Sequence, residues 1–291
     1  MAGELYAHLK AALRAAEPVA LATIIEGPAE QLGATMLIQT GGSREDPPFV
    51  MGSLGEPNLD RVVARDALGE LEVGRTGTRH YGSHGEARER ELSVFIESFA
   101  RPPRMIIFGA VDFTAALSRV AKVLGYQVTV SDPRPIFATA KRFPLADEIA
   151  IDWPNRYLEK IGSDLGPRDA VCVLTHDAKL DVPAITAALN TRVGYIGVMG
   201  NRRTHDNRND RLREAGVGEE GLERLRAPIG LDIGARTPEE TAVSICAEII
   251  ALRTGHEMPS LRDRGGPIHA RTSSPVSDPL SESGASTPAR A

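Results

Sequence analysis

A loop directly before a well-marked helix start carries the residue types best suited to bind a small anionic ligand. This loop reads Pro228-Ile229-Gly230-Leu231-Asp232-Ile233-Gly234-Ala235-Arg236. It is followed by Thr237, a favourable N-cap, by Pro238 at the first helical position, and by Glu240, which completes a capping box. Free backbone N–H groups at a helix start, together with Arg236, attract an anion, and Asp232 can accept a hydrogen bond from a hydroxyl or amino group. We therefore predict a binding loop; the alternative is a tight turn in which Asp232 and Arg236 pair with each other.

Two further polar segments follow expected strands in the same half of the chain. One strand runs into Thr175-His176-Asp177, which places a hydroxyl, an imidazole and a carboxylate together. The next runs into Gly200-Asn201-Arg202-Arg203, where a glycine turn and two guanidinium groups open a helix. Taken singly, His176 is as well explained by a structural hydrogen bond, and the arginines by a solvated helix face. Because the carboxyl ends of parallel strands meet at one edge of a sheet, the three loops together predict a shared ligand site.

The first strand of this half ends in a degraded form of a dinucleotide-binding turn. It reads Gly109-Ala110-Val111-Asp112-Phe113-Thr114. Val111 and Thr114 stand where close approach to a pyrophosphate and close helix packing need glycine. Asp132 follows the next strand at about the spacing of an acid that binds a ribose, but an Asp before Pro133 is also a common turn residue. Nucleotide binding and a structural turn both stay open for this segment.

Composition argues against several classes of function. The 291 residues carry a formal net charge of -5 without a long block of like charges, so nucleic acid is not an expected partner. The sequence has neither an apolar run of the roughly 18 residues that a membrane span needs nor a secretion signal, and we expect a cytoplasmic protein. Its two cysteines, Cys172 and Cys246, stand in apolar patterns typical of core positions and do not form a usual structural zinc motif. We predict no metal site.

Residues 1–100 are predicted to form a small α+β domain. Apolar side chains at helical spacing predict helices at residues 3–16 and 58–68, and short extended patterns predict strands at 19–25, 34–39, 49–54, 70–74 and 92–96. Arg101-Pro102-Pro103-Arg104 then forms a stiff extended connection, because proline fixes its own φ and restricts its neighbour. We place the domain boundary there.

Residues 101–256 are predicted to form a Rossmann-like domain with a parallel sheet, because short apolar runs alternate with amphipathic stretches as in βα units. The expected strands are 105–108, 127–130, 149–151, 170–174 and 195–199, and the expected helices are 115–124, 153–161, 182–189, 202–215 and 237–252. Residues 257–291 are rich in Ser, Pro, Arg and Gly and are predicted to be a disordered tail. The predicted fold class is α/β, with a C-terminal Rossmann-like parallel-sheet domain preceded by a smaller α+β domain.

Several motifs together resemble the XdhC/CoxI family. They are Phe108-Gly109-Ala110, Val130-Ser131-Asp132-Pro133-Arg134, Arg142-Phe143-Pro144, Leu174-Thr175-His176-Asp177, Gly197-Val198-Met199-Gly200-Asn201-Arg202-Arg203 and the segment from Pro228 to Glu240. The N-terminal segments Gly33-Ala34-Thr35-Met36 and Gly52-Ser53-Leu54-Gly55 are similar to the family as well. The resemblance implies a maturation factor for molybdenum hydroxylases such as xanthine dehydrogenase and carbon monoxide dehydrogenase. Such a factor binds the molybdenum cofactor (molybdopterin) transiently, assists its sulfuration and delivers it to the apoenzyme. The implied partner is that hydroxylase apoenzyme, and a cysteine desulfurase and a second copy of the chain are further candidates.

The chain departs from the family at two places. Many relatives have a cysteine after the Gly-Ser-Leu-Gly element, where this chain reads Glu56-Pro57-Asn58-Leu59-Asp60. Sulfur relay by a cysteine at this position is therefore not expected. The Gly109 turn, which commonly reads Gly-Ala-Gly-His-Val-Gly in relatives, has lost both later glycines and the histidine. Contact of this turn with a nucleotide or a pterin is thereby put in question.

The residues expected to bind the cofactor are Gly109, Ala110, Asp132, Thr175, His176, Asp177, Gly200, Arg202, Arg203, Asp232, Gly234 and Arg236. Molybdopterin carries a phosphate, a polar pterin and a dithiolene-bound metal, so a carrier needs an anion-binding helix start and hydrogen-bonding groups. We assign the phosphate to the Gly200 loop or to Gly234 and Arg236, the pterin edge to Asp232, Asp177 and Thr175, and the metal side to His176. No catalytic residue is assigned, because we expect a non-catalytic cofactor-binding chaperone. Two alternatives are an NAD(P)-dependent oxidoreductase and a non-catalytic assembly scaffold.

Overall fold

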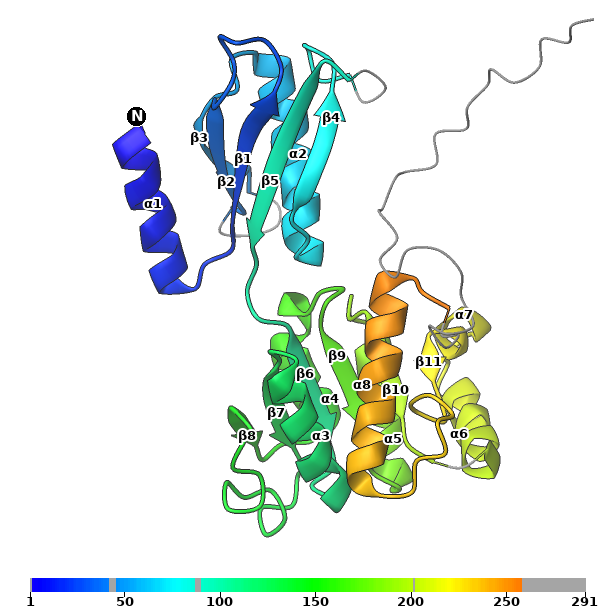
Figure 1. The fold of residues 1–291 in the computed structure, drawn as a ribbon. Coiled ribbons are helices and arrows are strands. Elements are labelled where there is room, and N and C mark those ends of the chain that lie inside the picture. Colours follow the sequence, from blue (N-terminus) through cyan, green and yellow to red (C-terminus); the bar gives the residue numbers. More distant parts are fainter. Residues whose placement is uncertain (1, 42–45, 87–89, 201, 258–291) are drawn as a thin grey trace, which may run out of the picture.

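The computed structural model describes residues 2–41, 46–86, 90–200 and 202–257, and within these ranges two β-sheets follow one another along the chain (Figure 1). The first is an antiparallel sheet of five strands and the second a parallel sheet of six, as counted in the described ranges. The predicted α/β fold class is confirmed, with a Rossmann-like sheet after a smaller antiparallel part. The domain limits themselves stay a prediction.

The first sheet has the strand order β3-β2-β1-β5-β4 and packs on two helices. Its elements are α1 (Ala2–Ala15), β1 (Val19–Glu26), β2 (Thr35–Gln39), β3 (Phe49–Gly52), α2 (Pro57–Val73), β4 (Gly77–Tyr81) and β5 (Leu92–Phe99). Ala20, Ala22 and Ile24 alternate along β1 and share one core with Leu59 and Val63 of α2. The opposite face of the sheet forms a smaller apolar cluster with α1.

The predicted strand at residues 70–74 is wrong, because α2 continues through this segment. Leu71 extends the buried stripe of α2, and Gly74 ends the helix in a left-handed conformation with φ 64°. Glu70, on the same helix, accepts hydrogen bonds from Arg75 and Arg79. The strand that follows in the chain is β4, at the edge of the sheet. Its alternating exposed residues give no strong apolar pattern in the sequence.

The second sheet has the strand order β11-β10-β9-β6-β7-β8, and its described strand pairs are parallel. Its elements are β6 (Arg104–Phe108), α3 (Asp112–Val123), β7 (Gln127–Ser131), β8 (Glu148–Ala150), α4 (Pro154–Ile161), β9 (Ala170–Val173), α5 (Ala178–Leu189), β10 (Tyr195–Val198), α6 (Arg202–Glu214), α7 (Glu219–Glu223), β11 (Leu225–Arg226) and α8 (Pro238–Thr254). The strands and helices predicted for this half are confirmed within a few residues at their ends. The sequence patterns did not predict α7 and β11, which are too short to show periodicity.

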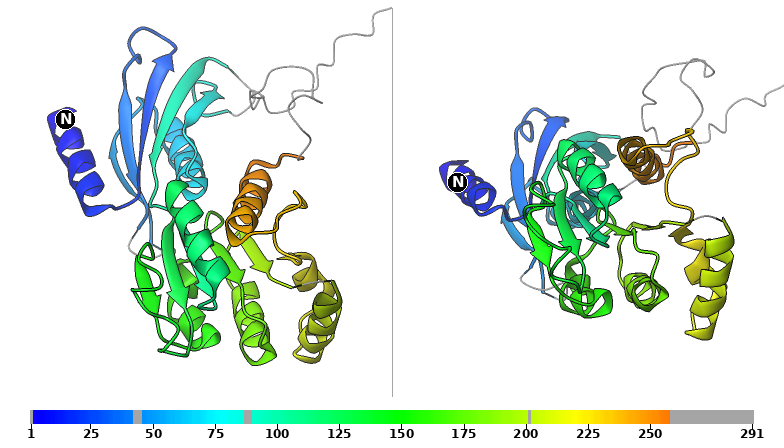
Figure 2. Two further views of the ribbon diagram at one scale, coloured as in Figure 1. Left: turned by 60° about the horizontal axis from the view of Figure 1, so that its bottom comes forward. Right: turned by 90° about the horizontal axis from the view of Figure 1, so that it is seen from below.

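Two layers of helices enclose the parallel sheet. In the view along the sheet in Figure 2, α3 and α8 cover one face, and α4, α5 and α6 cover the other. Met105 and Ile107 of β6 belong to the core between the sheet and α3 and α8. Ile106 and Phe108 belong to the core between the sheet and α4, α5 and α6, because successive side chains of a strand point to opposite faces. In the sheet, β7 lies on one side of β6 and β9 lies on the other. The strand order therefore reverses between β6 and β9, and the carboxyl ends of these two strands flank that point.

Three further predictions from the sequence concern the two cysteines, membrane-spanning helices and the C-terminal tail. Cys172 and Cys246 are confirmed as buried core residues without a disulfide. Among the described helices, none combines the length and the apolar character needed to cross a bilayer. The predicted tail beyond residue 257 lies outside the described residues.

Candidate ligand-binding site

The turn after β6 and the turn after β9 touch each other at the reversal of strand order. Gly109 has φ +109°, a conformation that L side chains rarely adopt. A Cβ at this position would lie 2.8 Å from Cγ2 of Thr175 and 3.1 Å from its backbone nitrogen. Glycine is therefore required here for the close approach of the two turns, whether or not the turn contacts a ligand.

We expect Gly109→Ala to destabilise the protein by about 1–2 kcal/mol from its positive φ alone, and further through the contact with Thr175. Gly125→Ala is the matched control, because Gly125 also has a positive φ of +80° but would place its Cβ in open space. Chemical denaturation should give the larger loss for Gly109→Ala. Equal losses of stability in the two variants would mean that the contact with Thr175 does not contribute to the effect of Gly109→Ala.

Asp132 follows β7 and bonds the Gly109 turn, which follows the neighbouring strand β6. Its carboxylate accepts hydrogen bonds from the backbone N–H of Ala110 at 3.0 Å and from the guanidinium of Arg134 at 2.9 Å. Burial raises the pKa of Asp132, but the hydrogen bonds from Arg134 and Ala110 outweigh it, and the net pKa lies below the usual value. Its side chain is fully buried, so its acceptor atoms hold the Gly109 turn together. Ligand binding by Asp132 and Ala110 stays a prediction.

A buried polar network, missed at the sequence level, ties the β9–α5 turn to the β10–α6 turn. Thr175 Oγ1 donates to Asp181 Oδ1, and Arg208 donates to Asp181 Oδ2 through Nε at 3.2 Å and Nη2 at 2.9 Å. The same Nη2 also donates to the carbonyl oxygen of Met199. Asp181 and Arg208 come from different helices, α5 and α6, so no local spacing links them. The network leaves Thr175 with its hydroxyl engaged inside the protein.

His176 and Asp177 lie on the exposed rim of the same turn. Asp177 is the N-cap of α5, where its carboxylate accepts a hydrogen bond from the backbone N–H of Lys179 at 2.9 Å. This cap explains the residue structurally and leaves its second carboxylate oxygen for other contacts. The assignment of both residues to a ligand stays a prediction.

The β10–α6 turn is described in part. Gly200 has φ +150° and lies against the network, with its hypothetical Cβ 3.5 Å from Nη2 of Arg208. Arg202 and Arg203 open α6, but their side chains and the whole of Asn201 lie outside the described residues. The predicted phosphate contacts of these two arginines are untested.

The loop before α8 is hydrogen-bonded to side chains of that helix. The backbone N–H of Gly230 donates to Glu248 Oε2 at 3.0 Å, and Ser244 Oγ donates to the carbonyl oxygen of Leu231 at 2.6 Å. Tyr195 of β10 donates to the same Glu248 oxygen at 2.6 Å. The loop is thus fixed to α8, and Glu248 links this contact to β10 of the parallel sheet.

The predicted start of α8 is confirmed in detail. Thr237 accepts from the N–H of Glu240, and the Glu240 carboxylate accepts from the N–H groups of Thr237 and Arg236 at 3.0 and 2.7 Å. These backbone hydrogen bonds lower the pKa of Glu240. Asp232 and Arg236 are both exposed, and no hydrogen bond or ion pair of either side chain occurs in the described part of the chain. The alternative of an internal Asp232–Arg236 pair therefore finds no support.

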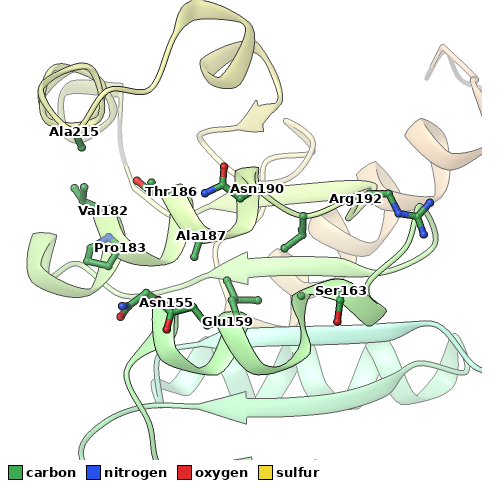
Figure 3. Close-up of a pocket in the computed structure, with 13 residues that line it drawn as sticks. Asn155, Glu159, Ser163, Val182, Pro183, Thr186, Ala187, Asn190, Arg192 and Ala215 are labelled. Carbon is green, nitrogen blue, oxygen red and sulfur yellow. The ribbon is translucent and has the colours of Figure 1, made fainter. Parts of the chain in front are cut away.

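A groove of about 700 Å³ lies away from these loops, along the seam of α4 and α5 (Figure 3). Its walls include Leu158, Val182, Pro183 and Ala187, with Arg192 toward one end. None of the predicted ligand residues lines it. The described residues also hold no group of three or more His, Cys, Asp or Glu side chains suited to a metal ion. The predicted site on the loops at the carboxyl edge of the sheet stays a prediction.

A parallel sheet flanked by two helix layers, with its strand order reversing beside β6, defines a Rossmann-type fold. Two family models match this chain: the XdhC Rossmann domain over residues 105–249 and the XdhC and CoxI family over residues 12–82. The chain belongs to the XdhC/CoxI family.

Three curated proteins illustrate the relationship. The chain is 28% identical over 250 residues to the uncharacterized protein YqeB of Escherichia coli K12, which covers 81% of this chain and 44% of that protein. It is 34% identical to a probable xanthine dehydrogenase subunit of Bacillus subtilis 168, covering 57% and 47%, and 28% identical to the molybdenum cofactor insertion chaperone PaoD of Escherichia coli K12, covering 57% and 45%. The chain spans less than half the length of these relatives.

A crystal structure described as a xanthine dehydrogenase from Bacillus halodurans is similar over 83% of this chain and 93% of that chain, with 23% identity and a TM-score of 0.48.

Proposed function

We propose that this protein binds the molybdenum cofactor as cargo and passes it to a molybdenum hydroxylase apoenzyme during maturation. The observation that carries the proposal is the exposure of Asp232 and Arg236 in the loop before the capped start of α8. These two side chains have opposite charges, and neither has a partner among the described residues. A site with a free guanidinium and a free carboxylate suits a ligand with a phosphate at one end and an amino-bearing heterocycle at the other. Membership of the XdhC/CoxI family, and a relative named a molybdenum cofactor insertion chaperone, support this cargo.

Sulfuration of the cargo is assigned to a separate sulfur donor, such as a cysteine desulfurase. Both cysteines of this chain are buried. Burial raises the pKa of the Cys172 thiol well above its usual value, and raises that of Cys246 to about 11. A sulfur carrier needs an accessible thiolate, so neither cysteine suits that role. The contribution of this chain is to hold the cofactor while sulfur arrives and to release it to a client of the xanthine dehydrogenase or carbon monoxide dehydrogenase type.

The geometry of the Gly109 turn disfavours the alternative of an NAD(P)-dependent oxidoreductase. The N–H of Ala110 donates to Asp132 and is not free for a pyrophosphate. Asp132 is itself buried and ion-paired with Arg134, so it does not present a free carboxylate to a ribose.

The test is the affinity of the protein for molybdopterin, measured anaerobically for the parent, Arg236→Ala and Asp232→Ala. Each variant should bind about tenfold more weakly or worse, because it loses a charge-assisted hydrogen bond. The melting temperature should not change, since neither side chain has a partner in the described protein. Arg65→Ala, which removes an exposed arginine of α2, is the control and should bind like the parent.

Three results would contradict the proposal. Parent-like affinity in both loop variants would mean that this loop is not the site. Tight NADPH binding by the parent with hydride transfer would favour the oxidoreductase. Absence of any molybdopterin binding, with a hydroxylase complex still formed, would favour the scaffold.

A further inference from the structure

The hydroxyl group of Tyr126 is buried and has no hydrogen-bond partner in the described part of the chain. Tyr126 directly precedes β7, is 2% exposed, and belongs with Cys246 and Ile249 of α8 to the core between the sheet and α3 and α8. Arg253 follows Ile249 by four residues and therefore stands on the same face of α8. Because a buried phenol usually finds a partner, this hydroxyl group marks a place for a further polar atom.

Three arginines gather in this region, where the two halves of the chain meet. Besides Arg253 they are Arg168 and Arg101, and Nη1 of Arg168 donates to the carbonyl oxygen of Arg101 at 2.8 Å. A Cβ on Gly74, the residue that ends α2, would lie 2.6 Å from the guanidinium carbon of Arg168. The C-terminal ends of α2 and α8 both face this junction (Figure 1). Nη1 of Arg101 is a second buried polar atom without a partner among the described residues.

The charges of these arginines act on one another and on the tyrosine. Burial raises the pKa of Tyr126, and the charges of Arg253 and Arg168 oppose that rise. Burial also lowers the pKa of Arg168, and the charges of Arg253 and Arg101 lower it further. The charge of Asp169 has the opposite effect. A guanidinium group whose charged form is disfavoured by two others lies in a region with an excess of positive charge.

The neighbouring carboxylate offsets only part of this charge. Asp169 accepts a hydrogen bond from Nη2 of Arg101 at 2.7 Å through one oxygen, and its other oxygen accepts a backbone N–H group. No ion pair of Arg168 or Arg253 occurs in the described part of the chain. The negative ends of α2 and α8 favour nearby cations and account in part for the position of these arginines. They supply no partner for the Tyr126 hydroxyl group.

We infer that the junction cluster, formed by Arg101, Tyr126, Arg168 and Arg253, binds a phosphate group. Its donors come from four separate segments and do not form one planar fork, so a tetrahedral phosphate suits them better than a carboxylate does. The phosphate accepts a hydrogen bond from the Tyr126 hydroxyl group and balances the excess positive charge. Because Arg168 lies against the end of α2, the bound phosphate also stabilises the contact between the two halves of the chain.

The junction cluster is distinct from the predicted site at the loops. Thr237 begins α8 at the carboxyl edge of the sheet, whereas Arg253 is in the last turn of the same helix. The 17 residues of α8 span about 25 Å. The inference therefore does not depend on the proposed cargo.

The experiment measures melting temperature, and affinity for inorganic phosphate by calorimetry, at constant ionic strength. Phosphate should raise the melting temperature of the parent, because it binds the folded state. Arg253→Gln and Tyr126→Phe should each bind phosphate at least about fivefold more weakly. In phosphate-free buffer neither variant should melt below the parent, since one removes a repelling charge and the other an unpaired hydroxyl group. Arg65→Gln, which removes an exposed arginine of α2, is the control and should respond like the parent.

Three results would overturn the inference. The first is a parent that does not bind phosphate, and the second is parent-like phosphate affinity in both variants, whatever their stability. The third is loss of phosphate binding in Arg236→Ala while Arg253→Gln retains it, which would place the phosphate at the loop before α8.

Adenosine monophosphate, tested with the same variants, distinguishes two sources of the phosphate group. A loss of affinity in Arg253→Gln that is larger for the nucleotide than for inorganic phosphate supports the phosphate of a larger molecule. An equal or smaller loss supports the free ion. Both outcomes support a phosphate site at the junction cluster.

Discussion

Replacing Arg208 with methionine is expected to lower the free energy of unfolding by about 3–5 kcal/mol. The change leaves the Asp181 carboxylate buried without its cation and frees the carbonyl oxygen of Met199. Both side chains of the ion pair are about 95% buried, so solvent does not screen the loss. Chemical denaturation measures the effect. Arg213, on the same helix as Arg208, forms an exposed pair with Glu219 of α7, and Arg213→Met should change stability little.

The pH dependence of this loss tests its cause. Burial raises the pKa of Asp181 above its usual 3.8, more than the hydrogen bonds from Thr175 and Arg208 lower it. Without Arg208 the pKa rises further. A carboxyl group with a raised pKa in the folded state favours folding below its unfolded pKa and loses that contribution as pH rises through the folded value. The loss should therefore be larger at neutral pH than in acid.

The double variant Arg208→Met plus Asp181→Asn supplies the check. Removing the charge of Asp181 should recover part of the stability at neutral pH, because no carboxylate is then left unpaired. No recovery, together with a loss of less than about 1 kcal/mol in Arg208→Met, would show that the pair is not a structural link between the two turns.

Phe108→Ala is expected to cost a similar amount, about 3–5 kcal/mol, for a different reason. Phe108 is fully buried at the end of β6, in the core between the sheet and α4, α5 and α6. Its removal loses apolar burial and leaves a cavity directly before Gly109. Thermal and chemical denaturation measure the loss. Phe49→Ala is a control at a half-exposed aromatic on β3, and a loss at Phe108 no larger than this one would contradict the expectation.

Much of the parallel-sheet half could be predicted from the sequence. Its central strands β6, β9 and β10 are buried on both faces and appear as nearly continuous apolar runs, and most of its helices have clear ends. The start of α8 is the best example, because Thr237, Pro238 and Glu240 determine it through contacts within one turn. The antiparallel half was harder to predict. Residues 70–74 look extended over a short window, yet the helical stripe that includes Leu71 continues into them.

The candidate site was only partly predictable. Its loops were found because polar residues follow each strand, and parallel strands bring such residues to one edge. The partners of those residues could not be found in this way. Asp132 bonds Ala110 across two strands, and Thr175 bonds Asp181, which in turn pairs with Arg208 of another helix. Asp232 and Arg236, four residues apart and a plausible pair in sequence, take no ion partner within the described chain.

Local spacing and residue type were enough to predict most of the elements of the parallel-sheet half, the capped start of α8, and that the loops after parallel strands lie at one edge of the sheet. They could not establish which polar groups are engaged inside the protein and which face solvent, because this depends on the three-dimensional arrangement. Hydrogen-bond partners from distant segments meet only after the sheet has formed, and each group has a limited number of bonds to give. The exposure of Ile136, in the connection between β7 and β8, has the same origin, since burial depends on which other segments of the folded chain cover a side chain.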